Sequence, residues 1–186
     1  MASEAPVVVY DACVLYPFHL RNLLVELAIE GLVAARWTDT IHDEWIRNLA
    51  KQARIAKSRL LITRDLMKAV LPEADIKNSE TLVPTLSLPD KSDRHVLAAA
   101  IAARASTILT WNVRHFPPSA LAPHAIVARD PDTFLTALAE TDVEAMSAVV
   151  EGARQNLRVT EPSPEAYLAA LRRQGLKSFV ARLKAS

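Results

Sequence analysis

The amino-acid sequence predicts an α/β fold with a mostly parallel central sheet flanked by helices, followed by a helical C-terminal extension. Short, fully apolar runs such as PVVVY at 6–10 and TILT at 107–110 are typical of strands buried in a parallel sheet. Helical patterns separate these runs along the chain, as expected for an α/β protein. Only helical patterns follow residue 130. We therefore expect one domain at 1–130 and a helical extension at 131–186.

The first part of the chain alternates strands and helices. The elements expected there are a strand at 6–10, a helix at 18–31, a strand at 32–37 and two helices between 44 and 71. Gly31 suits the end of the first long helix, where a left-handed backbone is common. Thr40 is expected to cap the next helix, with Asp43 completing a capping box. That start would place Glu44 in the first helical turn.

The second part is organised around one stretch at 88–117. Asp90 and Asp93 open an alanine-rich helix, a strand follows at 107–110, and a polar turn runs from 110 to 115. A further strand is expected at 126–128. The extension is expected to hold helices at 131–139, 142–157, 164–174 and 176–184.

Composition excludes several classes of protein. Of 186 residues, 51% are hydrophobic, so the chain can bury a proper core. The single cysteine excludes an internal disulfide and a cysteine-rich zinc site, and no glycine-rich phosphate loop occurs. The first residues, MASEAP, include no basic side chain, so a signal peptide is not expected, and no apolar run is long enough to suggest a membrane span. A cytoplasmic location is expected, without contact with a membrane.

Several carboxylates are predicted to meet at one edge of the sheet. Asp11 follows the first strand, and Asp90 and Asp93 open a later helix. In a parallel sheet, strand ends and helix starts meet at the edge where ligands commonly bind. We expect other acidic residues to reach this edge and to hold a divalent metal ion there. Each of these carboxylates also has a structural alternative as a helix cap or first-turn acid.

A nearly uniform basic face follows Glu44. The cations are Arg47, Lys51, Arg54, Lys57, Arg59, Arg64 and Lys68, in a chain whose net charge is only +1. Such a face beside an acidic site suits a phosphodiester substrate, whose backbone it would hold. A solvated helix surface is the alternative interpretation.

These residues together resemble the PIN domain family, in the branch of the VapC-type toxin ribonucleases. The resemblance is carried by Asp11 after the first strand, Glu44 in a helix, and the runs LPDKSDRHVLAAAI and TWNVRHFP. It covers roughly 6–130 and implies a three-layer PIN-like fold. The helical tail resembles the C-terminal extension of one VapC subgroup.

The resemblance implies roles for individual residues. It makes Asp11, Glu44 and Asp93 the ligands of Mg²⁺ (or Mn²⁺), with Asn112 as the fourth catalytic position, and it places Thr110, Asp90 and His115 beside the ligands. His115 departs from the family pattern, which has Asp there, and this lowers the negative charge of the site. Arg47, Lys51 and Arg54 are the residues expected to contact nucleic acid. Cys13 lies near Asp11, but without an assigned base it fits a small buried residue better than a nucleophile.

The expected function is therefore that of a metal-dependent endoribonuclease, the toxin of a type II toxin–antitoxin system. The expected partners are an RNA substrate and a cognate antitoxin protein, with a second copy of the chain in a homodimer as a further option. Two alternatives stay open. A PIN-like RNA-binding or interaction module with a weakened site would explain His115, and a structure-specific DNA nuclease of related fold would use the same carboxylates.

Overall fold

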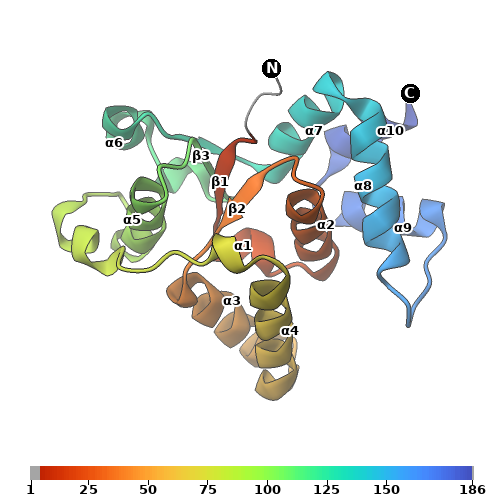
Figure 1. The fold of residues 1–186 in the computed structure, drawn as a ribbon, viewed down its shortest axis with the longest axis horizontal. Coiled ribbons are helices and arrows are strands. Elements are labelled where there is room, and N and C mark those ends of the chain that lie inside the picture. Colours follow the sequence, from red (N-terminus) through yellow and green to blue (C-terminus); the bar gives the residue numbers. More distant parts are fainter. Residues whose placement is uncertain (1–4, 186) are drawn as a thin grey trace.

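A four-stranded parallel sheet forms the centre of the computed structural model, which describes residues 5–185 (Figure 1). The strands are β1 (Val7–Tyr10), β2 (Ala34–Arg36), β3 (Thr107–Leu109) and β4 (Val127–Arg129). Their order across the sheet is β2-β1-β3-β4, and each neighbouring pair is parallel. The predicted α/β class with a parallel sheet is confirmed.

Helices cover the sheet and extend beyond one end of it (Figure 1). Those of the first part are α1 (Ala12–Leu15), α2 (Phe18–Ile29), α3 (Asp39–Gln52), α4 (Lys57–Val70), α5 (Arg94–Ala102) and α6 (Pro118–Leu121). Short 3-10 turns join them: η1 (Pro72–Ala74), η2 (Glu80–Thr85), η3 (Lys91–Asp93), η4 (Val113–His115) and η5 (Ala122–His124). In Figure 1, α2 and α5 lie on opposite sides of the sheet, and α3 and α4 project together below it.

The two central strands, β1 and β3, are buried because they are apolar on both faces, whereas the edge strand β4 is partly exposed. Val8, Val9 and Tyr10 of β1 are fully buried, as are Ile108 and Leu109 of β3. Parallel strands covered by helices on both sides require such continuous apolar runs. The alanine-rich α5 packs against β1 and β3, since small side chains allow a helix to approach a sheet closely.

The start of α3 differs from the prediction. Thr38, not Thr40, is the N-cap, and its hydroxyl accepts a hydrogen bond from the Ile41 backbone N–H at 3.2 Å. Thr38 has an extended backbone as the chain leaves β2, so the helix begins at Asp39. Glu44 therefore lies in the second turn, where neither capping nor the helix dipole accounts for it.

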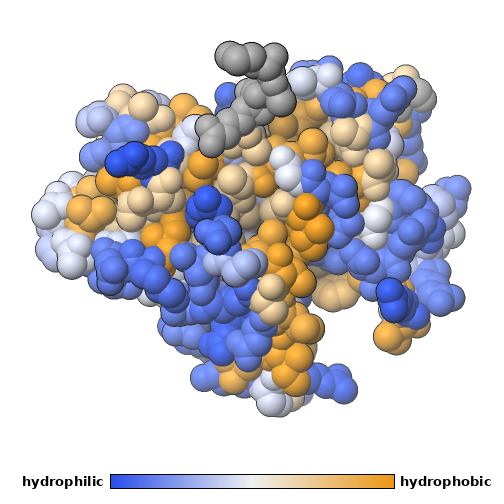
Figure 2. Space-filling model, in the orientation of Figure 1, coloured by the Kyte–Doolittle hydropathy of each residue, from blue (hydrophilic) through white to orange (hydrophobic). Residues whose placement is uncertain are grey.

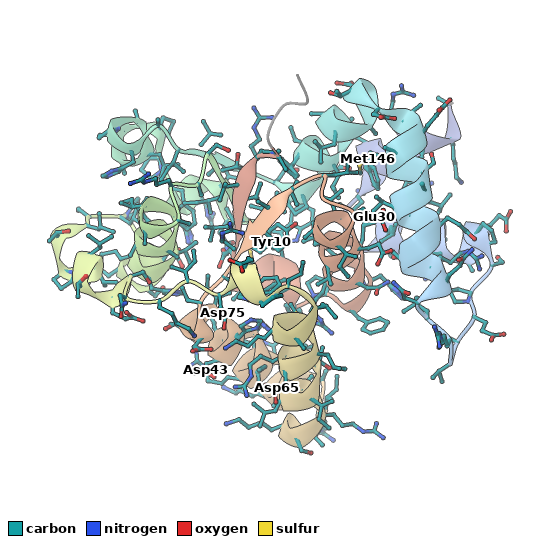
Figure 3. All side chains as sticks on the ribbon, viewed as in Figure 1. Tyr10, Glu30, Asp43, Asp65, Asp75 and Met146 are labelled. Atoms are coloured by element: carbon teal, nitrogen blue, oxygen red, sulfur yellow. The ribbon has the colours of Figure 1, made fainter. Side chains whose placement is uncertain are left out.

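Four helices form the C-terminal extension: α7 (Pro131–Thr141), α8 (Val143–Gln155), α9 (Pro164–Arg173) and α10 (Lys177–Lys184). They pack on the α2 side of the sheet. Met146, labelled in Figure 3, is buried on α8, and α8 packs against α2. Hydrogen bonds join the same surfaces, because Asn22 Nδ2 donates to the Ala153 carbonyl at 2.6 Å and the Leu20 N–H donates to Gln174 Oε1 at 2.8 Å. The predicted helical extension is confirmed.

The turn between α9 and α10 reaches the C-terminal end of the sheet. Gly175 has φ of +104°, and a Cβ added there would lie 2.8 Å from the Trp111 ring. Trp111 lies two residues beyond Leu109, where β3 ends. The extension therefore supports the edge at which the candidate site lies. The predicted division of the chain at residue 130 stays a prediction.

None of the helices formed by residues 5–185 has both the length and the apolar character needed to cross a membrane.

Candidate metal centre

A cleft of about 280 Å³ opens at the C-terminal edge of the sheet. Its walls come from the end of β1, the face of α3, the start of α5 and the turn after β3. The lining residues are Asp11, Ala12, Cys13, Tyr16, Glu44, Asn48, Gln52, Asp93 and Asn112. The structure therefore brings all four residues of the predicted catalytic set to one cleft.

Asp11 is the innermost carboxylate of the cleft. It follows Tyr10, whose position at the end of β1 is labelled in Figure 3, and its side chain is 4% exposed. It occupies the N-cap position of α1 without making a capping hydrogen bond. Instead, Asp11 Oδ2 accepts a hydrogen bond from the Thr110 hydroxyl at 2.6 Å and one from the Cys13 thiol at 3.2 Å. The structural alternative of a helix cap is thus excluded for Asp11.

Burial raises the pKa of the Asp11 carboxyl. The two hydrogen bonds from Thr110 and Cys13 oppose this increase, while the neighbouring carboxylates Glu44 and Asp93 add to it. The ionised form of Asp11 therefore lacks a compensating positive charge. A buried carboxylate beside two others is stabilised when a cation binds among them.

Glu44 reaches the cleft from one face of α3. Glu44, Asn48 and Gln52 are spaced four residues apart and all line the cleft, as expected for one face of a helix. Glu44 Oε2 lies 3.4 Å from His95 Nε2, which belongs to α5. His95 Nδ1 is buried and has no hydrogen-bond partner. This contact connects the helix that carries Glu44 to the helix that Asp93 precedes.

Asp93 lies just before α5 and makes no capping bond to that helix. Its Oδ2 lies 2.7 Å from His115 Nδ1. Asp90 instead caps the 3-10 turn η3 that leads into α5, since its Oδ1 accepts hydrogen bonds from the Ser92 N–H and hydroxyl at 2.9 and 2.6 Å. The structural role that the sequence left open for this pair of aspartates thus belongs to Asp90.

Asp90, Asp93 and His115 form a compact group. One ligand atom of each lies within 4.8 Å of those of the other two, and Asp11 and Glu44 are not part of this group. Asp93 also lines the cleft together with Asp11 and Glu44. It is therefore shared between two sets of ligand atoms.

The donor set fits a divalent cation. Three carboxylates converge in the cleft, and among residues 5–185 no Lys or Arg side chain forms an ion pair with any of them. Oxygen ligands of this kind suit hard ions such as Mg²⁺, and a carboxylate–imidazole mixture also suits transition metals. The cluster can hold a metal ion, and its own chemistry leaves the identity of that ion open.

Cys13 is held as a neutral thiol. Burial raises its pKa to about 12, and the neighbouring Asp11 carboxylate contributes to the increase. Its sulfur also accepts a hydrogen bond from the Trp111 N–H at 3.2 Å. The nucleophilic thiolate would therefore be scarce at neutral pH.

A polar wall of the cleft was not predicted from the sequence. Tyr16, Asn48 and Gln52 line it, and the Tyr16 hydroxyl donates a hydrogen bond to Gln52 Oε1 at 3.1 Å. Four-residue spacing from Glu44 was the available signal for Asn48 and Gln52, once Glu44 is assumed to face the site. No comparable pattern marks Tyr16.

The predicted nucleic-acid contacts lie beside this wall. Arg47, Lys51 and Arg54 are exposed, and none of them pairs with an acidic residue in the part of the chain that the structure describes. Arg47 and Lys51 lie three residues beyond Glu44 and Asn48, on the adjoining face of α3. Arg54 follows the end of the helix with a left-handed backbone, φ +53°.

Comparisons with known proteins agree with the fold and the cleft. Residues 7–114 match the PIN domain family, and residues 131–185 match the VapC50 C-terminal domain. A curated protein of Mycobacterium tuberculosis named "Putative ribonuclease VapC50" is 50% identical over 60 residues, which are 32% of this chain and 36% of that protein. The aligned segment thus spans about a third of the relative's length. No solved structure matches the chain. Since the family match covers more than half of the 186 residues, the chain belongs to the PIN domain family, with a VapC50-type C-terminal domain.

Proposed function

We propose that this chain is a divalent-metal-dependent endoribonuclease that acts as the toxin of a toxin–antitoxin pair. The observation that carries the proposal is the convergence of Asp11, Glu44 and Asp93 in one cleft of a PIN domain, without a Lys or Arg partner among the described residues. Three carboxylates that line one cleft, and whose charges raise the pKa of the buried Asp11, are suited to holding a cation.

The chain's own residues hold and orient the reacting groups. Asp11, Glu44 and Asp93 would hold Mg²⁺ or Mn²⁺, and the Asn112 side chain lies at the same cleft. Thr110 fixes the orientation of the Asp11 carboxylate through its 2.6 Å hydrogen bond. The bound ion would supply an activated water and stabilise charge on the phosphate.

No side chain of the cleft is needed as a nucleophile. The raised pKa keeps Cys13 protonated, so attack by water is favoured over attack by sulfur. The hydrolysis then breaks one phosphodiester bond and adds the elements of water across it.

RNA is the proposed substrate because cations and hydrogen-bonding groups lie next to the cleft. The exposed Arg47, Lys51 and Arg54 would hold phosphates, while Tyr16, Asn48 and Gln52 can hydrogen-bond to sugars or bases. The name of the mycobacterial relative supports ribonuclease activity over deoxyribonuclease activity.

A protein partner is part of the proposal. An apolar groove of about 370 Å³ runs between α2 and α4, with Phe18 and Ile29 on one side and Leu66 and Val70 on the other. Each of these four side chains is roughly half exposed or more. Figure 2 shows a hydrophobic stripe along α4, beside the hydrophilic surface of α3. Exposed apolar surface of this kind is typical of protein-binding sites, which supports an antitoxin or a second copy as a partner.

The proposal is tested by cleavage of total cellular RNA in Mn²⁺, Mg²⁺ or EDTA. We expect discrete fragments with the wild type in either metal, none in EDTA, and none with Asp11→Asn or Glu44→Gln. Asp43→Asn is the matched control, because Asp43 neighbours Glu44 on α3 but is exposed and lies outside the cleft. Full activity of Asp11→Asn would refute the site.

The toxin role has its own readout. Expression of the wild type alone is expected to slow growth, and expression of Asp11→Asn is not. A harmless but catalytically active wild type would remove the toxin role and leave the ribonuclease.

One observation favours a second candidate function. His115 stands where the family pattern has Asp, which removes a carboxylate from the site and motivates a PIN-like module that binds RNA without cutting it. In that case RNA binding persists while no metal supports cleavage. Flapped DNA in the same assay distinguishes a DNA nuclease.

A further inference from the structure

We infer that the polar wall of the cleft, formed by Tyr16, Asn48 and Gln52, is a subsite for one unpaired nucleobase of the RNA substrate. The inference rests on the proposed function, because it assigns the part of the same cleft that the carboxylates do not occupy. It requires that a base of the RNA, and not only its phosphates, contributes to binding.

The cleft changes from acidic to neutral along α3. At a rise of about 1.5 Å per residue, Asn48 lies about 6 Å and Gln52 about 12 Å along the helix axis from Glu44. The wall residues carry no charge at neutral pH, whereas phosphates are held mainly by cations, which the adjoining face of α3 supplies. The wall is therefore suited to the uncharged part of a nucleotide.

The side-chain amides of the wall have free hydrogen-bonding groups. Gln52 Oε1 accepts a hydrogen bond from the Tyr16 hydroxyl at 3.1 Å, and the Gln52 side-chain N–H groups have no acceptor in the part of the chain that the structure describes. The Asn48 side chain has no hydrogen-bond partner among residues 5–185, so its amide offers both a donor and an acceptor. A donor beside an acceptor matches the edge of a base, as in the paired contacts that Asn or Gln makes with adenine.

Tyr16 supplies an aromatic surface beside these amides. It is half-buried, and it is the only aromatic residue among the described residues that line the cleft. Bases of single-stranded RNA stack on such side chains while their edges form hydrogen bonds. Bases within a duplex are already stacked and paired, so the wall favours single-stranded RNA.

A buried arginine fixes the position of Tyr16. Arg21 Nη1 donates hydrogen bonds to the Leu15 and Tyr16 carbonyls at 2.6 and 3.3 Å. The Arg21 side chain is 6% exposed, and its guanidinium lies 4.7 Å from the centroid of the Trp45 ring on α3. Arg21 thus joins the end of α1 to α3 before RNA binds. Groups that are already held in place lose little conformational freedom on binding.

The competing explanation is purely structural. The hydrogen bond between Tyr16 and Gln52 would then only join α1 to α3, and its loss would weaken binding of every RNA alike. The two explanations differ in one measurable property, which is whether the contribution of Tyr16 to affinity depends on the presence of bases.

The experiment measures binding of the full-length protein to two fluorescent single-stranded RNAs of roughly eight nucleotides, by anisotropy in EDTA. One RNA has its bases, and in the other a hydrogen atom replaces every base, so that sugars and phosphates remain. The quantity compared is the ratio of the two dissociation constants. We expect the wild type to bind the RNA with bases roughly 5- to 150-fold more tightly, the range for one base stacked on an aromatic side chain.

The variants separate the ring from the hydrogen bond. Tyr16→Ala should reduce the ratio to about 1, whereas Tyr16→Phe, which keeps the ring but cannot donate to Gln52, should retain most of it. Asn48→Ala should lower the ratio by a smaller factor. Arg47→Ala is the matched control, because it should weaken binding of both RNAs equally and leave the ratio unchanged. Thermal melting checks that each variant is folded.

The inference is overturned if the wild type binds both RNAs equally or binds neither, or if the ratio is unchanged in Tyr16→Ala and Asn48→Ala. Cleavage is not read in this experiment, so the two proposals can fail separately. A chain that cleaves RNA in Mn²⁺ but binds both probes equally would keep the proposed function and lose the base subsite. A chain with a base-dependent ratio and no cleavage in any metal would keep the base subsite and lose the nuclease.

Discussion

Asp11→Asn is expected to stabilise the metal-free protein and to destabilise it relative to wild type when metal is present. The carboxylate is 4% exposed and shares its cleft with Glu44 and Asp93. Removing its charge removes the free-energy cost of burying an ionised carboxylate and reduces the repulsion among the three carboxylates. The Thr110 hydroxyl can still donate to the amide oxygen of Asn, so little is lost.

The magnitude follows from opposing terms. Burial raises the pKa of Asp11, so removal of its charge is expected to increase the free energy of unfolding in EDTA. For a chain of this size, each 1 kcal/mol of added stability corresponds to a rise in Tm of roughly 2–4 °C. In contrast, Mn²⁺ at 100 times its Kd stabilises the wild type by about 2.7 kcal/mol, and the variant should lose most of this gain.

The pH dependence has a definite sign. Because the folded-state pKa of Asp11 is raised above its ordinary value of 3.8, the cost of the charge is absent at lower pH and grows as pH rises through the folded-state pKa. The stability advantage of Asp11→Asn in EDTA should therefore vanish near pH 3 and be complete at neutral pH.

Melting curves of wild type, Asp11→Asn and the exposed control Asp43→Asn, each in EDTA and in Mn²⁺, provide the test. A lower Tm of Asp11→Asn in both conditions would contradict the reasoning, because it would mean that the carboxylate stabilises the fold without an ion. Asp43→Asn should change the free energy of unfolding by no more than about 0.5 kcal/mol in either condition.

Three further predictions concern the surroundings of the cleft. A triple variant replaces the basic residues by alanine, at Arg47, Lys51 and Arg54. For its binding to single-stranded RNA, the slope of the logarithm of the binding constant against the logarithm of the salt concentration should be shallower by about 2. An unchanged slope would show that these residues do not contact the RNA phosphates. Gly175→Ala should lower Tm more than Gly31→Ala, since both have positive φ but only the first would meet a side chain, that of Trp111; equal decreases in Tm would show that the close approach of residue 175 to the Trp111 ring does not affect stability. The Cys13 thiol, with its pKa raised to about 12, should react with iodoacetamide far more slowly than a free thiol at pH 8, and unfolding in denaturant should abolish the difference.

The fold was predictable because its strands and helices are locally distinct. The apolar runs at β1 and β3 and the Gly31 helix stop, with φ of +73°, are readable from sequence and agree with the structure. The start of α3 was predicted at the wrong threonine, because either Thr38 or Thr40 can cap a helix and only the extended backbone after β2 selects Thr38. Local pattern cannot determine such a choice when two capping residues lie two positions apart.

The site was predictable only in part, for a physical reason. Strand ends and helix starts indicated where Asp11 and Asp93 would lie, because sheet topology places them at one edge. The sequence could not show that Asp90 caps while Asp93 does not, nor that His95 meets Glu44 and His115 meets Asp93. These are contacts between separate elements, and no local periodicity encodes them.

The C-terminal helices are expected to be required for the cleft itself. Removal of 131–186 would uncover the face of α2 against which α8 and α9 pack, and it would leave Trp111 without its Gly175 neighbour. Each fully buried apolar side chain contributes about 1.5–3 kcal/mol, and the extension buries several. Loss of even a few of these buried contacts is large beside the roughly 5–15 kcal/mol by which most domains are stable.

A fragment of residues 1–130 should therefore melt without a cooperative transition and bind no Mn²⁺, whereas the full chain should melt cooperatively and bind Mn²⁺. Adding the separately expressed 131–186 segment should restore at least part of the transition if the two parts recognise each other through α2. A fragment that melts cooperatively and binds Mn²⁺ as tightly as the full chain would establish 1–130 as an independent domain. The extension would then be a candidate surface for partners, because the cleft would keep its shape without it.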